Sequence, residues 1–479
     1  MSVSGWRCRL VAGARLRTRQ GRHFLVCGAP LAVLELRERG RRLLASLPPG
    51  EEVTIPEPPG PELRLLHRLA GLGLLDLRPA RARWPDVSIV VPVRDRAAEL
   101  DTCLRSLRRV RYPGAPPRVV VVDDGSRRPV TAPAGVRVVR LDRPVGPGRA
   151  RNAGAALCTT ELLAFLDSDC RAEPGWLEAL VPELGDPAVA AAGGRVLPER
   201  ERSWLERYEA VRSPLDLGAI AAPVRPRRPV PYLVTANLVV RRAVFDAIGG
   251  FDPEMDPGED VDLCWRLAAA GHRLVYRPEA AVRHAHRGAL PDFLATRARY
   301  AGSEAVLLRR HPGNGRWLGF SPGLGALVAG GLGVLLGRPG LLAAGGLALG
   351  LEVAAAAGKL EGLGVPRRRA AAALLRGQAG SLYHAARQLT RYYGLGAALV
   401  ALSWRPARMR LGPALAAAAL APAVADWYRL RPRLSLPAFL AAHLLDDAAY
   451  QYGLLRGCLR ERSAAALGVE VRLAGGRPD

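Results

Sequence analysis

Aromatic side chains are scarce in this chain, making up only 5% of its 479 residues. The formal net charge of +25 would suit a nucleic-acid partner, but the arginines are spread along the whole length and no basic stretch is interleaved with aromatics. Proteins that bind single-stranded nucleic acids stack bases on aromatic rings inside a basic groove. The composition therefore argues against a nucleic-acid-binding protein, and leaves anionic lipid or a phosphorylated substrate as partners for the positive charge.

Cysteine is sparse too. The seven cysteines are widely separated and contain no Cys-x-x-Cys pair, which argues against a disulfide framework or a zinc site and for a reducing compartment. The first residues, Met1 to Gln20, carry arginines but no apolar run, so we expect no signal peptide. These absences predict a cytoplasmic protein, placed at the inner face of the cell membrane if its C-terminal apolar runs bind lipid.

The length predicts two or three structural units. In residues 1–83, apolar positions recur at helical spacing from Leu31 to Leu44 and from Pro61 to Leu77, on either side of a proline-rich connector. A strand-like run, Phe24 to Val26, precedes them. This pattern predicts a small winged-helix module; the alternative is a plain structural appendage.

Residues 86–310 alternate between apolar strands and helices. Near-continuous apolar strands separated by helices indicate an α/β unit whose parallel sheet is buried on both faces. The expected elements, in chain order, are a strand from Val87 to Val93, a helix from Ala97 to Arg109, strands from Val119 to Val122 and from Val136 to Arg140, a helix after the loop Val145 to Gly154, and a strand from Leu162 to Leu166.

Residues 311–479 are rich in alanine, glycine and leucine. The window Trp317 to Gly337 is uncharged, a second apolar run extends from Gly340 to Leu351, and only Arg338 carries charge between them. A span needs roughly 20 apolar residues, so these runs predict a re-entrant membrane hairpin with both ends cytoplasmic. Shorter runs, Gly394 to Trp404 and Leu411 to Ala425, predict interfacial helices. A soluble helical region is the alternative.

Three acidic clusters follow one another in the second unit: Asp123-Asp124-Gly125-Ser126, Asp167-Ser168-Asp169 and Gly258-Glu259-Asp260. Each lies at the end of an apolar run or just after a tight turn, where strands deliver side chains to the mouth of an open α/β sheet. Carboxylates are costly to gather in a cleft unless positive charge lies among them. A divalent metal bound to a diphosphate would supply that charge, so the clusters predict nucleotide-sugar chemistry.

Each cluster has a plainer alternative. Asp169 could ligate Mg²⁺ or Mn²⁺, or could cap the following helix. Asp124 could accept the N–H of a uracil ring, or could cap a strand-to-helix turn. Asp260 could deprotonate an acceptor hydroxyl so that it displaces a diphosphate with inversion, or Glu259 and Asp260 could complement the dipole of a helix.

Between the first two clusters, Arg149-Ala-Arg-Asn152 follows a Gly-Pro-Gly loop. An arginine at a helix N-terminus combines guanidinium donors with backbone amides, which suits a base or a pyrophosphate. An ordinary solvated helix start is the alternative.

The order of these motifs resembles that of the inverting glycosyltransferases of family 2. The resemblance covers most of the second unit and implies a GT-A-type fold, with a mixed, mostly parallel sheet, and a hexosyltransferase activity. The motifs that carry it are Ile89-Val-Val-Pro-Val93, Val-Asp-Asp-Gly-Ser126, Ala150-Arg-Asn-Ala-Gly154, Phe-Leu-Asp-Ser-Asp169, Ala236-Asn237, Arg241-Arg242, Gly-Gly-Phe-Asp252 and Gly-Glu-Asp260.

The resemblance implies roles for individual residues. Asp124 would contact the uracil with Arg94 near the base, and Asp167 would face the ribose. Asp169 would hold Mg²⁺ or Mn²⁺, and Asp260 would be the general base. The other candidate positions are Pro92, Asp123, Arg149 and Asn152 in the nucleotide-sugar site, Glu259 beside the base, and His284 or, second, His286 at the metal or diphosphate.

One motif of the processive cellulose- and hyaluronan-type synthases is missing. Where they carry Gln-x-x-Arg-Trp after the base, this chain has Arg297-Ala-Arg-Tyr-Ala-Gly302. With at most one apolar hairpin as well, we do not expect a polysaccharide-extruding channel.

The layout of the whole chain is similar to that of the glycosyltransferases of the actinobacterial mycofactocin system. The first unit resembles PqqD-like peptide-recognition domains, and the apolar tail ends in His443 to Tyr452. The similarity implies that glucose from UDP-glucose is added to mycofactocin or its peptide-derived precursor, which the first module would hold. Two alternatives stay open: the same chemistry on a lipid-phosphate or cell-envelope acceptor, or a non-catalytic scaffold.

Overall fold

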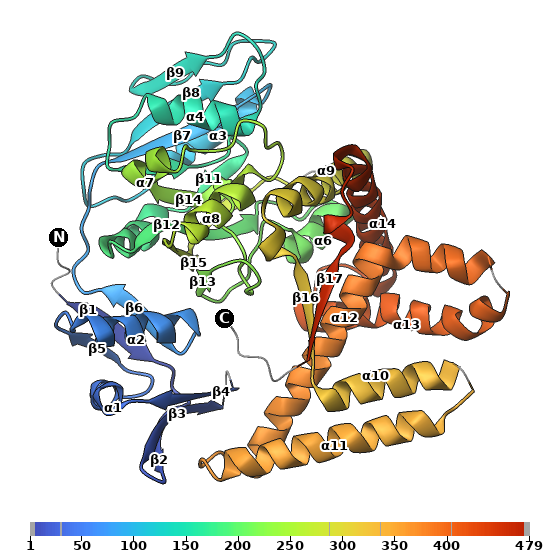
Figure 1. Cartoon of the computed structure of the whole chain (residues 1–479). Coiled ribbons are helices and arrows are strands. Elements are labelled where there is room, and N and C mark those ends of the chain that lie inside the picture. The colour runs from blue at the N-terminus through green and yellow to red at the C-terminus, as the bar shows by residue number, and fades with distance from the viewer. Residues whose placement is uncertain (1–4, 29–30, 287, 336, 404, 474–479) are drawn as a thin grey trace.

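The chain folds into a central α/β unit flanked by a small N-terminal module and a set of long C-terminal helices (Figure 1). The computed structural model describes residues 5–473 except 29–30, 287, 336 and 404. In Figure 1 the α/β unit lies above the N-terminal module, and the helices α9 to α14 lie beside both.

The N-terminal module contains two three-stranded sheets, ordered β5-β1-β6 and β2-β3-β4, and two helices. Its core contains Trp6, Leu25, Leu44, Leu66 and Leu77. The elements are β1 (Trp6–Leu10), β2 (Ala14–Arg19), β3 (Arg22–Gly28), β4 (Leu31–Leu36), α1 (Glu38–Ala45), β5 (Glu52–Ile55), α2 (Gly60–Gly71) and β6 (Leu75–Pro79).

Two helices predicted in this module are shorter than the sequence suggested, and the missing part of each is a strand. β4 takes the first half of the predicted helix from Leu31 to Leu44, because its backbone pairs antiparallel with β3. The second predicted helix ends at Gly71, and after a turn at Gly73, where φ is +70°, β6 pairs with β1. A left-handed glycine commonly ends a helix. Both segments are strands because they pair with a neighbouring strand, and the spacing of apolar residues in the sequence does not show that pairing.

The central α/β unit is built on a nine-stranded mixed sheet ordered β11-β15-β12-β14-β10-β7-β8-β9, with β13 paired to β15. β10, β7, β8 and β9 run parallel to one another, and β14 runs antiparallel between β10 and β12. The strands are β7 (Val87–Val93), β8 (Arg118–Asp123), β9 (Val136–Arg140), β10 (Leu162–Phe165), β11 (Cys170–Ala172), β12 (Val189–Pro198), β13 (Ala222–Val224), β14 (Leu238–Arg241) and β15 (Arg273–His284).

Helices cover both faces of this sheet and form two apolar cores, one on each side. A Cβ on Gly154 would lie 2.5 Å from Cγ1 of Val90, so only glycine lets α4 pack this closely on the strands. The helices are α3 (Ala97–Leu107), α4 (Pro147–Ala156), α5 (Trp176–Leu180), α6 (Trp204–Arg212), α7 (Arg242–Ala247), α8 (Glu259–Ala269) and α9 (Leu290–Arg310).

The C-terminal region is helical, as predicted, and carries one small parallel sheet of two strands. The first run predicted as a short interfacial helix lies in α12 up to Ser403, its last residue, Trp404, is outside the described residues, and the second run lies in α13. The elements are β16 (Arg316–Phe320), α10 (Pro322–Leu335), α11 (Gly340–Glu361), α12 (Arg367–Ser403), α13 (Arg405–Leu430), α14 (Leu436–Glu461) and β17 (Val469–Leu473).

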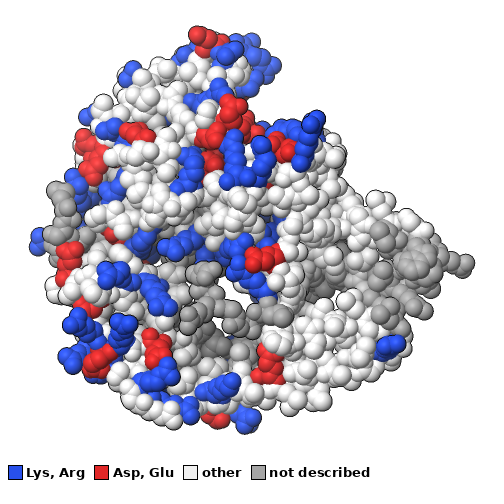
Figure 2. All heavy atoms as spheres, in the orientation of Figure 1, with Lys and Arg blue, Asp and Glu red and all other residues white. Residues whose placement is uncertain are grey.

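α10 and α11 form an antiparallel hairpin with an exposed apolar surface. Leu332, Leu347 and Leu351 are 58%, 65% and 62% exposed, and Figure 2 shows that the lobe formed by these helices carries few charged side chains on the face in view. Among the described residues, α11 is the one helix long and apolar enough to cross a membrane. The predicted uncharged window also includes β16, which pairs with β17 and is no part of a span.

The N-terminal module contacts both other units. Val26 on β3 packs with Ala357 of α11 and Ala370 of α12 in one small apolar core. On another side, Arg277 of the nine-stranded sheet donates to Asp76 of β6 at 2.8 Å.

Candidate active site

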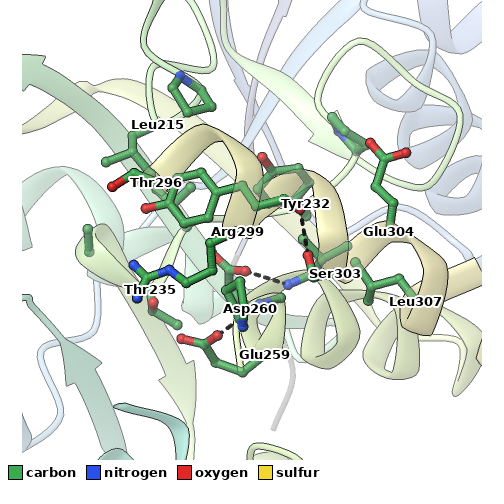
Figure 3. Close-up of a pocket in the computed structure, with 18 of the residues that line it drawn as sticks. Leu215, Tyr232, Thr235, Glu259, Asp260, Thr296, Arg299, Ser303, Glu304 and Leu307 are labelled. Carbon is green, nitrogen blue, oxygen red and sulfur yellow. Dashed lines mark hydrogen bonds between the residues drawn. The ribbon is translucent and has the colours of Figure 1, made fainter. Parts of the chain in front are cut away.

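A cavity of about 1370 Å³ opens at the carboxyl ends of β7, β8 and β10 and extends to the C-terminal helices. Asp124, Asp169 and Asp260 all line it, as the sequence predicted. Parallel strands end at one edge of a sheet, which explains why the first two acids meet. Asp260 arrives on the first turn of α8, and Figure 3 shows it beside Glu259 and close to Tyr232 and Ser303.

Asp124 fixes the loop that precedes α4. Its carboxylate accepts hydrogen bonds from the backbone N–H groups of Val145, at 2.7 Å, and Gly146, at 3.0 Å. Pro92 and Arg94 line the cavity next to it. Asp123 does not line the cavity; it accepts from the N–H of Ser126 at 2.9 Å and holds the turn after β8.

Arg149 and Asn152 lie outside the cavity lining in the described part of the chain. The Arg149 guanidinium donates to the carbonyl of Pro253 at 2.9 Å, and Asn152 exchanges hydrogen bonds with the backbone of Phe251. Both residues therefore position the loop before α8. Of the two arginines in this run, Arg151, two positions after Arg149 on α4, is the one that lines the cavity.

Arg151 joins two of the acidic clusters. Its guanidinium, which is almost wholly buried, donates to Asp167 at 2.5 Å and to Glu259 at 2.7 Å. Burial alone would lower the pKa of Arg151, but the two carboxylates outweigh it and raise the pKa. The arginine stays charged and supplies part of the positive charge that gathered acids require.

Among the described residues, Asp260 forms no ion pair, although the charge of Arg151 partly offsets the rise in its pKa. Its Oδ1 accepts from the N–H of Val261 at 2.8 Å. Burial, and after it the negative charge of Glu259, raises the pKa of Asp260 from 3.8 to about 7. A carboxyl group with a pKa near the working pH suits a general base.

Asp169 and His284 are the candidate metal ligands that the fold brings together. Cys170 of β11 pairs with His284 of β15, and this register puts the His284 Nε2 3.5 Å from the Asp169 carboxylate. Arg96 also contacts that carboxylate. Burial would raise the pKa of Asp169, but His284 and Arg96 outweigh it and hold the pKa below its usual range.

These donors fit a hard cation that arrives with a nucleotide sugar. No group of three or more acidic, histidine or cysteine side chains in the described residues could hold a metal ion by itself. Mg²⁺ in proteins is commonly held by one or two side chains, with phosphate oxygens of the substrate and water completing its shell. One carboxylate and one imidazole at the cavity wall meet that requirement.

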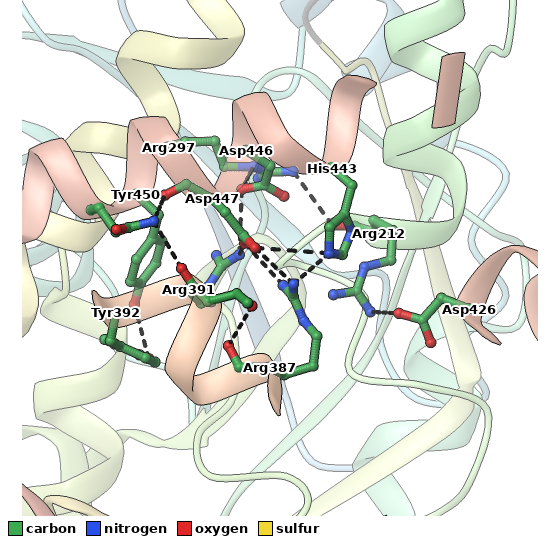
Figure 4. A network of polar contacts seen from close by, with 12 residues as sticks. Arg212, Arg297, Arg387, Arg391, Tyr392, Asp426, His443, Asp446, Asp447 and Tyr450 are labelled. Atoms are coloured by element: carbon green, nitrogen blue, oxygen red, sulfur yellow. Dashed lines mark hydrogen bonds and ion pairs between the residues drawn. The ribbon is translucent and has the colours of Figure 1, made fainter. Parts of the chain in front are cut away.

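A charged network leads from Asp169 and His284 into the C-terminal helices. The His286 imidazole lies 3.3 Å from that of His284, and Glu209 lies between His286 and Arg297. Arg297 of α9 then pairs with Asp446 of α14 at 3.2 Å. Figure 4 shows the network continuing through Arg391, Asp447, Arg387 and His443, which join α12 to α14.

Comparisons with known proteins identify the family. The sequence model "Glycosyl transferase family 2" matches residues 88–249. The chain is 38% identical over 425 residues to the "Pre-mycofactocin glycosyltransferase" of Mycobacterium tuberculosis, covering 83% of this chain and 86% of that protein. The chain belongs to glycosyltransferase family 2.

The chain is also similar to two less closely related proteins. "Glycosyltransferase AglE" of Haloferax volcanii is 30% identical over 202 residues, which is 40% of this chain and 64% of that protein. Among solved structures, the mannosyltransferase PcManGT from Pyrobaculum calidifontis, in complex with GDP-Man and Mn²⁺, is 22% identical with a TM-score of 0.39, over 72% of this chain and 88% of that one.

The chain is thus a glycosyltransferase with a GT-A-like mixed sheet. Sequence reasoning missed Arg96 and Arg151 as members of the site. The sequence did carry a signal for Arg151, since it stands in the same Arg-Ala-Arg-Asn run as Arg149. Choosing between the two arginines required knowing which face of α4 packs toward the acids.

Proposed function

We propose that this glycosyltransferase moves a hexose, glucose from UDP-glucose, onto mycofactocin or its peptide-derived precursor. The observation that carries the catalytic part is the meeting of Asp124, Asp169 and Asp260 on one cavity. The acceptor is supported by the similarity to the mycobacterial protein along most of both chains. Residues 1–83 would be a PqqD-like module that holds the peptide part, residues 86–310 the catalytic domain, and residues 311–479 a helical region.

In the proposed donor site, Asp124 and Arg94 bind the base, with Pro92 beside them. Asp167, oriented by Arg151, contacts the ribose. Asp169 and His284 would hold Mg²⁺ or Mn²⁺, which when bound neutralises charge on the leaving diphosphate. The other positions, Asp123, Arg149 and Asn152, act by holding the loops on which these groups stand.

In the proposed reaction, Asp260 takes the proton of an acceptor hydroxyl, and that oxygen bonds to the anomeric carbon from the face opposite UDP. The bond from the anomeric carbon to the diphosphate oxygen breaks, and its electron pair leaves with UDP. Glu259, held by Arg151, keeps a negative charge near Asp260 and so keeps it basic. One displacement inverts the configuration at the anomeric carbon.

The experiment is transfer from UDP-glucose with Mn²⁺, comparing a premycofactocin-type acceptor with polyprenyl phosphate. We expect a glucosylated small molecule, and donor hydrolysis when no acceptor is present. Faster transfer to polyprenyl phosphate would favour the lipid alternative. If the protein neither transfers glucose nor hydrolyses UDP-glucose, the assignment of glucose as the sugar is refuted. If it neither transfers nor hydrolyses any nucleotide sugar, the proposal that it is an enzyme is refuted.

We further propose that the α10–α11 hairpin lies on the membrane surface. Between Arg316 and Glu352 the only charged residue is Arg338, at the turn. The end of α11 packs on the N-terminal module, so only Gly340 to Leu351 is free, about 18 Å of helix against the roughly 30 Å of a bilayer core. An arginine at the bilayer centre is costly, so the hairpin lies in the interface.

Sedimentation with phosphatidylcholine–phosphatidylglycerol vesicles tests this. Leu347→Glu with Leu351→Glu should release the protein from the vesicles. Leu459→Glu, on α14, alters a leucine that is 79% exposed outside the hairpin and should leave binding unchanged. Equal sedimentation of both variants would contradict the proposal.

A further inference from the structure

Six described aromatic side chains line the cavity of this aromatic-poor chain. None of these six comes from β7, β8 or β10, whose ends carry the proposed donor residues. The aromatic residues among the described lining are Tyr232, Trp265, Phe293, Tyr300, Trp317 and Tyr450.

Apart from Tyr232, these aromatic residues lie beyond the range that the family sequence model matches. β16 contributes Trp317, α12 contributes His384 and Gln388, and α14 contributes Tyr450, all beyond residue 249 where the match ends. The cavity volume of about 1370 Å³ exceeds the roughly 300–1,000 Å³ typical of a pocket for one small ligand. A donor and a second compact molecule can therefore be held together.

Asp260 lies close to two of these aromatic residues. The hydroxyls of Tyr232 and Tyr300 feel its charge, which contributes, after burial, to raising the pKa of each. In Figure 3, Tyr232 and Ser303 stand on one side of Asp260, and Glu259 on the other. A hydroxyl brought in from the side of Tyr232 and Ser303 would reach Asp260.

The same wall is unsuited to a hydrocarbon chain. Arg391 lines it, pairs with Asp447 at 3.2 Å and lies over the Tyr450 ring, and Glu304 lines it while paired with Arg316 at 2.7 Å. A hydrocarbon chain offers these charged groups no hydrogen-bonding partner, and covering charges with apolar groups is costly. No described residue of α10 or α11 lines the cavity, so the exposed hairpin forms no part of its described wall.

We propose that β16, α12 and the aromatic residues around Asp260 form the acceptor subsite, and that it takes a compact acceptor with a flat ring and hydrogen-bonding groups, not a lipid. This rests on the proposed function and specifies it. Trp317 and Tyr300 supply ring faces, and aromatic rings pack against one another by stacking or edge contacts. His384 and Gln388 supply polar groups from one face of α12, four residues apart.

The test uses the full-length protein with Mn²⁺ and UDP-glucose, and a premycofactocin-type phenol or alcohol as acceptor. His384→Ala, Gln388→Ala and Trp317→Ala should each raise the acceptor KM at least about tenfold. Donor hydrolysis without acceptor should be unchanged in these variants. Arg376→Ala removes an exposed polar side chain from the same helix outside the lining, and should change neither reaction.

The outcomes separate this proposal from the one on which it rests. If the wild-type protein hydrolyses no nucleotide sugar, the proposed function fails. If hydrolysis is intact but the three variants keep the wild-type acceptor KM, the acceptor subsite is wrong. Polyprenyl phosphate as the better acceptor, with a KM that rises in His384→Ala, would overturn the compact-ring class while keeping the subsite.

Discussion

Replacing Asp260 by asparagine should stabilise the protein while it removes the proposed base. The pKa of Asp260 is about 7 in the folded protein and 3.8 when unperturbed. Between these values the folded protein keeps a proton that the unfolded chain has released, so stability falls as pH rises from about 4 to about 7. The difference of about three in pKa corresponds to a loss of about 4 kcal/mol in the free energy of unfolding, and the whole loss is present above pH 7.

Asp260→Asn has no such cost. Thermal unfolding should show a smaller gain of the variant over the wild type at pH 5 than at pH 8, because only about a third of the pH interval between 3.8 and about 7 has been crossed at pH 5. Asp246→Asn, the same change in an exposed ion pair with Arg242, should show no such rise with pH. Equal unfolding temperatures of Asp260→Asn and wild type at pH 8 would refute the burial argument.

Turnover should respond in the opposite direction. Loss of a general base typically costs about 10²–10⁴-fold in rate, so the more stable variant should be nearly inactive while still binding UDP. For the wild type, kcat/KM should rise with pH through about 7, where Asp260 loses its proton. Wild-type turnover in the variant would remove Asp260 as the base.

Three further perturbations test other parts of the site. Asp169→Ala should abolish the gain in UDP affinity that Mn²⁺ gives the wild type, measured by calorimetry; an unchanged gain would exclude Asp169 as a ligand. Arg151→Ala should leave Asp167 and Glu259 unpaired and lower the free energy of unfolding by about 3–5 kcal/mol in denaturant. Asp447→Ala should cost a similar amount by stranding the buried Arg387, whereas replacing both partners by leucine and methionine should cost much less; equal losses would contradict the pairing.

The catalytic unit was predictable because its signals are local. Where an apolar strand is followed at once by charged or acidic residues, as at Val87 to Val93 and at Leu162 to Asp169, one short stretch of sequence predicts both the strand and the position of site residues. The bounds of β7 and β9 agree with the prediction, β8 is one residue longer at each end, and β10 is one residue shorter at its C-terminal end. Asp124 and Asp169 could be expected in one cavity because strand ends of a parallel sheet share an edge, whereas Asp260 reaches the cavity on the first turn of α8.

What the sequence could not show depends on contacts between distant segments. The pairing of β11 with β15 places His284 beside Asp169, although 115 positions separate the two residues in the sequence. β4 is a strand because β3 lies beside it, although its apolar spacing also fits a helix. The ion pairs between α12 and α14 were invisible for the same reason, and arginines read as a spread of surface charge proved to include Arg387 and Arg391 inside the helical region.

The small apolar core that contains Val26, Ala357 and Ala370 joins the N-terminal module to α11 and α12. Together with the Arg277–Asp76 contact on its other side, it fixes the module to the rest of the chain at two places. A peptide anchored on that module would therefore sit at a constant distance from the sugar, and its own length would decide which of its atoms can be glycosylated. The N-terminal module would thereby set the distance between the anchored end of the peptide and the atom that is glycosylated.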